Sequence, residues 1–111
     1  MISIEQLKNN GADVETGLSR CVGNKDLYLK LVNMGLSDKK FEELGTAITQ
    51  NDLTQAFELC HALKGVIGNL ALTPLFDALS QMTEKLRARE NADYSKMYSD
   101  ILEIRSKFSG S

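Results

Sequence analysis

The sequence predicts an all-α protein: an antiparallel up-down four-helix bundle with one or two short helices at its N-terminus. Apolar residues recur at helical spacing along nearly the whole chain of 111 residues, and no segment alternates as a strand does. Proline occurs once, at Pro74, so few positions interrupt a long helix. Short connections between the successive long segments favour antiparallel neighbours.

Length and composition fit a single domain with one hydrophobic core. No run approaches the roughly 20 apolar residues of a membrane helix, and the N-terminus lacks a secretory signal pattern. The formal net charge of -2 gives no global basic field for nucleic acid. Cys21 and Cys60 are expected to be free thiols in a reducing cytoplasm. We therefore expect a cytoplasmic protein, monomeric by default, that neither enters a membrane nor binds nucleic acid.

Residues 1–23 are predicted to form short helices. The first spans residues 4–10 and ends at Gly11, because glycine is a common helix stop. Asp13 can then cap a second short helix that reaches Cys21.

Residues 25–108 are predicted to form the bundle. Apolar residues on one face mark the first stretch: Leu27, Leu31, Met34, Phe41, Leu44 and Ile48. Gly35 interrupts this pattern, so the stretch is one kinked helix or two helices in succession. Asp52 precedes the next helix, which runs from about Leu53 to Gly68.

The last two helices follow the same spacing. Thr73 as an N-cap, with Pro74 in the first turn, predicts the start of a helix that reaches about Arg89. Residues 109–111 are expected to be a flexible tail. The apolar stripes of these two helices are Leu75, Leu79, Met82 and Leu86, and then Tyr94, Met97, Ile101, Ile104 and Phe108.

His61, the only histidine, is predicted to face away from the core. Each helical residue turns about 100°, which puts the apolar stripe of this helix roughly 145° from His61. A buried histidine is therefore excluded if the helix forms. The stripe consists of Leu53, Ala56, Leu59, Cys60, Leu63, Val66 and Ile67.

The neighbours of His61 on this face suggest chemistry. Within about 60° of it lie six residues: Thr54, Phe57, Glu58, Lys64, Gly65 and Gly68. Each has an ordinary explanation: glycines mark fraying helix ends, a single exposed phenylalanine is common, and a lysine is usually solvated. Together they suit a nucleophilic imidazole that carries a phosphoryl group, with Lys64 offsetting its charge and the glycines leaving room for a partner protein.

The run from His61 to Gly68 resembles the signature of histidine-containing phosphotransfer (HPt) domains of bacterial and eukaryotic phosphorelays. That signature has a histidine, a lysine three residues on, a glycine four on and a small residue seven on, which His61, Lys64, Gly65 and Gly68 match. Residues 11–18 also look like the N-terminal part of such domains in hybrid sensor kinases.

The resemblance implies a function and partners. His61 would accept a phosphoryl group from a receiver-domain aspartate and pass it to another, with Lys64 neutralising charge and Gly65 giving clearance. The partners would be receiver domains of response regulators or hybrid sensor kinases. Kinase or phosphatase machinery is not expected. This chain would bind no cofactor or metal, and Mg²⁺ and its carboxylate ligands would belong to the receiver.

The resemblance also implies contacts from the following helix. The position 22 residues after the histidine, which often hydrogen-bonds the ring in this family, holds Thr83 rather than the common glutamine. Gln81 is the alternative if that helix is rotated. Arg87 matches a position that is basic in some members, and Ala71 stands where the family usually has glycine. The expected partner surface is Thr54, Phe57, Glu58, Gly65, Gly68, Thr83 and Arg87.

Three other functions fit less well. A zinc site or a Cys-His hydrolase would need Cys60 beside His61, yet adjacent helical residues point about 100° apart. A non-catalytic helical interaction module, such as a degenerate relay domain that binds through Phe57, remains the alternative function. A chemotaxis-kinase phosphotransfer domain is a near relative of the same class.

Overall fold

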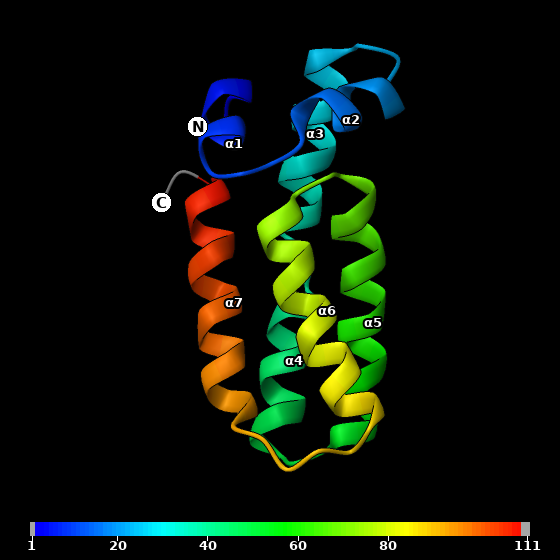
Figure 1. The fold of residues 1–111 in the computed structure, drawn as a ribbon, viewed down its shortest axis with the longest axis vertical. Coiled ribbons are helices and arrows are strands. Elements are labelled where there is room, and N and C mark those ends of the chain that lie inside the picture. Colours follow the sequence, from blue (N-terminus) through cyan, green and yellow to red (C-terminus); the bar gives the residue numbers. More distant parts are fainter. Residues whose placement is uncertain (1, 110–111) are drawn as a thin grey trace.

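The computed structural model describes residues 2–109 (Figure 1). Within this part of the chain the backbone forms helices and no strand, so the predicted all-α class is confirmed. The helices are α1 (Ile4–Asn9), α2 (Val14–Arg20), α3 (Lys25–Leu36), α4 (Lys40–Thr49), α5 (Leu53–Asn69), α6 (Thr73–Arg87) and α7 (Tyr94–Ser109).

The molecule is elongated, with extents of 41 × 24 × 20 Å. Helices α4, α5, α6 and α7 run along the long axis, and α1 and α2 lie at one end of it (Figure 1). Helix α5, which carries His61, packs most extensively against α6 and also against α4 and α3. Helix α7 packs against α6, α4 and α3. None of the helices in the described part is long and apolar enough to cross a membrane.

Side-chain caps begin two of these helices as predicted. Asp13 accepts a hydrogen bond from the backbone N–H of Thr16 at 3.2 Å and so begins α2. Asp52 accepts one from the backbone N–H of Gln55 at 3.1 Å and so begins α5. Both caps satisfy amide groups that have no partner within their own helix.

The start of α6 differs from the prediction. Leu72 is the cap residue and Thr73 is already helical, so Thr73 is not the N-cap. The Thr73 hydroxyl donates instead to the carbonyl of Ala71 at 3.5 Å. Ala71 has a φ of 59°, in the left-handed region that favours glycine. Glycine adopts this conformation without strain, whereas Ala71 adopts it at a steric cost.

The first predicted stretch is two helices in succession. Helix α3 continues through Gly35 and ends at Leu36, and α4 starts at Lys40. A Cβ on Gly35 would lie 2.6 Å from Leu70 Cδ1, so glycine permits the close approach of α3 to the end of α5.

The predicted apolar face of α3 is not the buried one. Leu27, Leu31 and Met34 are 41%, 37% and 59% exposed. The core is filled by the neighbouring stripe of Tyr28 and Val32, and the Tyr28 hydroxyl donates to the carbonyl of Leu70 at 2.8 Å. Helix α3 has two apolar stripes, and this buried hydrogen bond accompanies burial of the one that contains Tyr28.

The C-terminal boundary also needs correction. Ser109 is the last residue of α7, and its hydroxyl donates to the carbonyl of Ser106 at 2.9 Å. Ser109 therefore does not belong to a flexible tail. Gly110 and Ser111, the rest of the predicted tail, lie outside the described residues.

Candidate functional site

The outward face of α5 carries the candidate site. His61 is exposed, whereas Cys60 before it and Leu63 after it are fully buried. This alternation follows from the helical turn of about 100° per residue. The imidazole thus points away from the core, as the spacing predicted, and another protein can reach it.

An aromatic stack holds the imidazole on one side. The ring of Phe57 lies one turn before His61, with ring centroids 5.8 Å apart and planes inclined by 30°. The guanidinium carbon of Arg87 on α6 lies 5.3 Å from the Phe57 ring centroid. Arg87 also pairs with Glu84 at 3.2 Å. Stacking and cation–π contacts of this kind stabilise by about 0.5–1.5 kcal/mol each, so they favour one orientation of the imidazole.

Lys64 lies one turn beyond His61 and is half-buried. No ion pair in residues 2–109 joins its ammonium to a carboxylate. Glu58, the nearest predicted carboxylate, is exposed and forms no such pair. The positive charge of Lys64 is therefore available to an anion beside His61.

The two glycines of the motif have different environments. Apart from the nearby backbone of α5 and the two chain neighbours, no heavy atom lies within 4 Å of the place where a Gly65 Cβ would be, and Gly65 is exposed. A Cβ on Gly68 would meet two ring carbons of Phe76 at 2.9 Å. Gly65 leaves open surface, whereas Gly68 lies against the ring of Phe76 on α6. The role of Gly68 in giving clearance to a partner stays a prediction.

Thr83 does not belong to the partner surface. It is 0% exposed, and its hydroxyl lies 2.7 Å from the carbonyl of Leu79 and 3.2 Å from Cys60 Sγ. Helix α6 turns this side chain toward the buried Cys60 rather than toward His61. The exposed Gln81 has no recorded hydrogen bond to His61 either, so neither candidate on α6 holds the imidazole.

Two polar groups that the sequence did not single out lie near the site. Arg89 donates to Thr54 Oγ1 at 3.0 Å, at the start of α5. Ser80 has a buried hydroxyl that finds no hydrogen-bond partner among residues 2–109. Ser80 follows Phe76 by four residues and precedes Arg87 by seven, so all three lie on the stripe of α6 that faces α5. That spacing is the sequence signal that could have identified Ser80.

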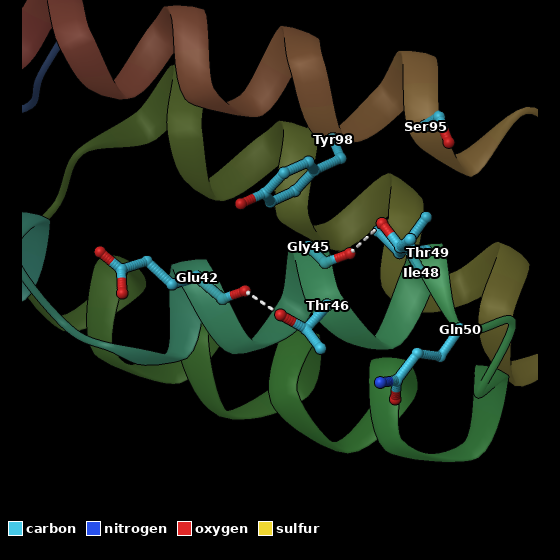
Figure 2. A pocket seen from close by; sticks show the side chains of 8 residues that line it. All are labelled: Glu42, Gly45, Thr46, Ile48, Thr49, Gln50, Ser95 and Tyr98. Carbon is cyan, nitrogen blue, oxygen red and sulfur yellow. Dashed lines mark hydrogen bonds between the residues drawn. The ribbon is translucent and has the colours of Figure 1, made fainter.

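A pocket lies between α4 and α7, away from His61 (Figure 2). Its volume is about 560 Å³. Tyr98 of α7 reaches toward α4, where its hydroxyl donates to the carbonyl of Phe41 at 2.8 Å. Thr46 and Thr49 donate to carbonyls of their own helix. None of its lining residues belongs to α5, so this pocket is separate from the His61 site.

Metal ligands do not gather at the site. In the described part of the chain, no three His, Cys, Asp or Glu side chains are grouped so that they could hold a metal ion. Cys60 is a buried free thiol, and burial raises its pKa to about 11. It is therefore a protonated core residue at neutral pH rather than a thiolate ligand or nucleophile.

An exposed imidazole with an uncommitted lysine one turn away, on a helix of an all-α protein, defines the class of histidine phosphotransfer domains. The family model described as "Hpt domain" matches residues 35–106, so the chain belongs to the HPt family. This family carries out histidine phosphotransfer in two-component phosphorelays. No curated protein and no solved structure matches the chain. The match covers α4, α5, α6, α7 as far as residue 106, and every predicted site residue, but not α1 or α2.

Proposed function

We propose that His61 is the phosphoryl carrier of a relay between two receiver domains. The observation that supports this most directly is the exposed imidazole between the open surface at Gly65 and the stack with Phe57. Lys64, which pairs with no carboxylate among residues 2–109, supplies positive charge one turn away. Under the same proposal the helices form an antiparallel up-down four-helix bundle. In it α3 and α4 together take the place of the first helix, and α5, α6 and α7 are the other three.

The transfer is a reversible exchange between an aspartyl phosphate and the imidazole. The unprotonated outward ring nitrogen of His61 attacks the phosphorus, and the bond from phosphorus to the aspartate oxygen breaks. The aspartate leaves as a carboxylate, and the other ring nitrogen keeps its proton. A second receiver reverses these steps, so no net oxidation or hydrolysis occurs. The loose transition state needs positioning and charge neutralisation rather than further covalent chemistry from the protein.

The roles of the neighbouring residues follow from their positions. The Lys64 ammonium offsets charge on the phosphoryl oxygens. Gly65 lets the partner backbone approach, because its surface is open. Mg²⁺ and its carboxylate ligands belong to the receiver. The domain is thus a phosphocarrier without kinase activity of its own.

The decisive test is phosphoryl transfer from phosphorylated receiver domains in the presence of Mg²⁺. We expect label on this chain that is acid-labile and base-stable. His61→Gln should abolish labelling and change the free energy of unfolding by less than about 0.5 kcal/mol, because the side chain is exposed. Circular dichroism and thermal melting provide the folding control.

A broad panel of receivers that leaves the wild-type chain unlabelled would contradict the proposal. That result would favour the alternative, a helical interaction module without chemistry. The structure weakens the alternative in one respect. Phe57, its expected contact residue, is half-buried and lies against Arg87.

A further inference from the structure

A positively charged cavity lies where α2 meets the end of α5 and the start of α6. Its volume is about 410 Å³. It contains two cationic side chains and no carboxylate. The lining residues are Arg20, Lys64, Gly65, Gly68, Asn69, Ala71, Thr73 and Phe76.

Arg20, the last residue of α2, is fixed at the rim of this cavity. Its Nη1 donates to the carbonyl of Gly68 at 2.8 Å and to that of Asn69 at 3.0 Å. No hydrogen bond in residues 2–109 uses its Nη2 or Nε. The guanidinium is therefore held in place by one nitrogen, and its remaining donors are available to an anion.

Within residues 2–109 neither Arg20 nor Lys64 forms an ion pair with a carboxylate. They share this with most cations of the chain, since the ion pairs of the described residues involve Lys40, Lys85, Arg87 and Lys96. The carboxylate of Asp13 is committed elsewhere. Its hydrogen bonds with Thr16 are the main cause of its lowered pKa, and the charge of Arg20 contributes least. This local excess of positive charge contrasts with the net charge of -2.

We propose that this cavity binds an acidic side chain of the receiver domain, and that Arg20 is a docking residue that selects the receiver. The proposal rests on the function assigned above to His61. The cavity begins at Gly65, and residues 61 and 68 are separated by only roughly 10 Å along α5. The receiver face that approaches His61 is acidic, because it carries the carboxylates that hold Mg²⁺. A carboxylate on that face can accept two hydrogen bonds from the guanidinium.

The family match points to selectivity rather than to a general requirement. It covers residues 35–106, so Arg20 lies outside the part that defines the family. A cation supplied by α2 can therefore distinguish receivers without altering the chemistry at His61. Such rim charges act mainly on the rate of association and on its salt dependence.

A purely structural role for Arg20 is the competing explanation. Its hydrogen bonds cap two carbonyls at the C-terminal end of α5. Two conservative variants separate the roles. Arg20→Gln keeps a hydrogen-bond donor without charge, and Arg20→Lys keeps the charge. Thr73→Asp adds a negative charge to the cavity but leaves Arg20 untouched. An acidic residue in the first turn of α6 also favours that helix, so this variant should fold.

The test measures kcat/KM for transfer from a receiver that labels His61, at low and at higher ionic strength. We expect Arg20→Gln and Thr73→Asp to lower kcat/KM by about 10-fold through KM and to flatten its salt dependence. Arg20→Lys keeps the charge but loses the paired guanidinium donors, so it should lower kcat/KM less than Arg20→Gln does. Lys107→Gln, on exposed α7 surface, is the matched charge control and should have no effect.

Unchanged transfer by both Arg20→Gln and Thr73→Asp would overturn the docking role. A lowered melting temperature in Arg20→Gln alone would then assign Arg20 to capping. Absence of transfer to the wild-type chain from every receiver would instead refute the function of His61, and the docking role with it. The two failures are thus distinguishable by the wild-type result.

Discussion

Gly65 and Gly68 belong to the same helix and the same motif, yet they serve different parts of the molecule. A side chain on Gly65 would enter open space, whereas one on Gly68 would collide with the ring of Phe76 at 2.9 Å. The first glycine lies on the exposed surface beside His61, where the proposed function places the partner. The second lies against α6, where it permits close packing.

The difference shows that residues of one sequence motif can be needed for different reasons, some for function and some for packing. Under the proposed function, the outward face of α5 meets a partner protein, whereas its flank toward α6 serves the packing of the fold. Substitutions on the outward face should therefore change transfer with little effect on stability. Substitutions on the flank should change stability with little effect on transfer.

The largest effect is expected for Gly65→Leu. The new side chain would stand beside His61 and hold the receiver aspartate away from the imidazole. A misplacement of 1 Å can cost roughly 100-fold, so we expect transfer to slow by about that factor. Stability should rise by up to about 1 kcal/mol, because leucine is a better helix former than glycine. Transfer at the wild-type rate would refute the clearance role of Gly65.

Gly68→Ala should have the opposite profile. Overpacking against Phe76 should lower the free energy of unfolding by about 1–3 kcal/mol, measured by urea denaturation. Well below the melting temperature, transfer should remain near the wild-type rate. The double variant Gly68→Ala with Phe76→Leu removes the colliding ring and should recover part of the loss. A stable Gly68→Ala protein with slow transfer would return Gly68 to the partner surface.

The sequence was sufficient for features that depend on one helix at a time. The caps at Asp13 and Asp52 were predictable from side-chain chemistry next to an apolar run. The exposure of His61 followed from angles along α5. The start and end of α5 agree with the predicted ones to within one residue.

Features that depend on how two helices meet were not predictable. The environments of Thr83 and Gly68 are fixed by the rotation of α6 against α5, which no spacing within α5 specifies. Burial of Tyr28 in place of Leu27 depends on the carbonyl of Leu70, 42 residues away in sequence. The position of Arg20 beside the site was not predictable for the same reason, because it depends on how α2 packs against the end of α5.

Cys60 offers a test of the inward side of α5, since it adjoins His61 but is fully buried. Burial raises its pKa from 9.0 to about 11. Above pH 9 the unfolded chain loses the thiol proton of Cys60, whereas the folded chain retains it until the pH approaches 11. The contribution of Cys60 to the free energy of unfolding is therefore fully present below pH 9 and is lost as the pH rises toward 11. At pH 10 the loss should be about 1 kcal/mol. Cys60→Ala should reduce the loss of stability between pH 8 and pH 10 in urea denaturation, whereas His61→Gln should leave it unchanged. The tyrosines with raised pKa values, Tyr28, Tyr94 and Tyr98, account for the remaining loss.

The smallest effect is expected at Phe57, which connects the two sides because it contacts both His61 and Arg87. Phe57→Leu keeps apolar volume but removes the ring, so it should cost about 0.5–1 kcal/mol in orientation of the imidazole. That loss corresponds to transfer slowed by about 2- to 5-fold. Phe57→Tyr preserves the stack and should transfer at the wild-type rate. Equal rates for Phe57→Leu and Phe57→Tyr would show that the aromatic ring does not orient the imidazole. Gly65 and Lys64 would then be the neighbours of His61 that affect transfer.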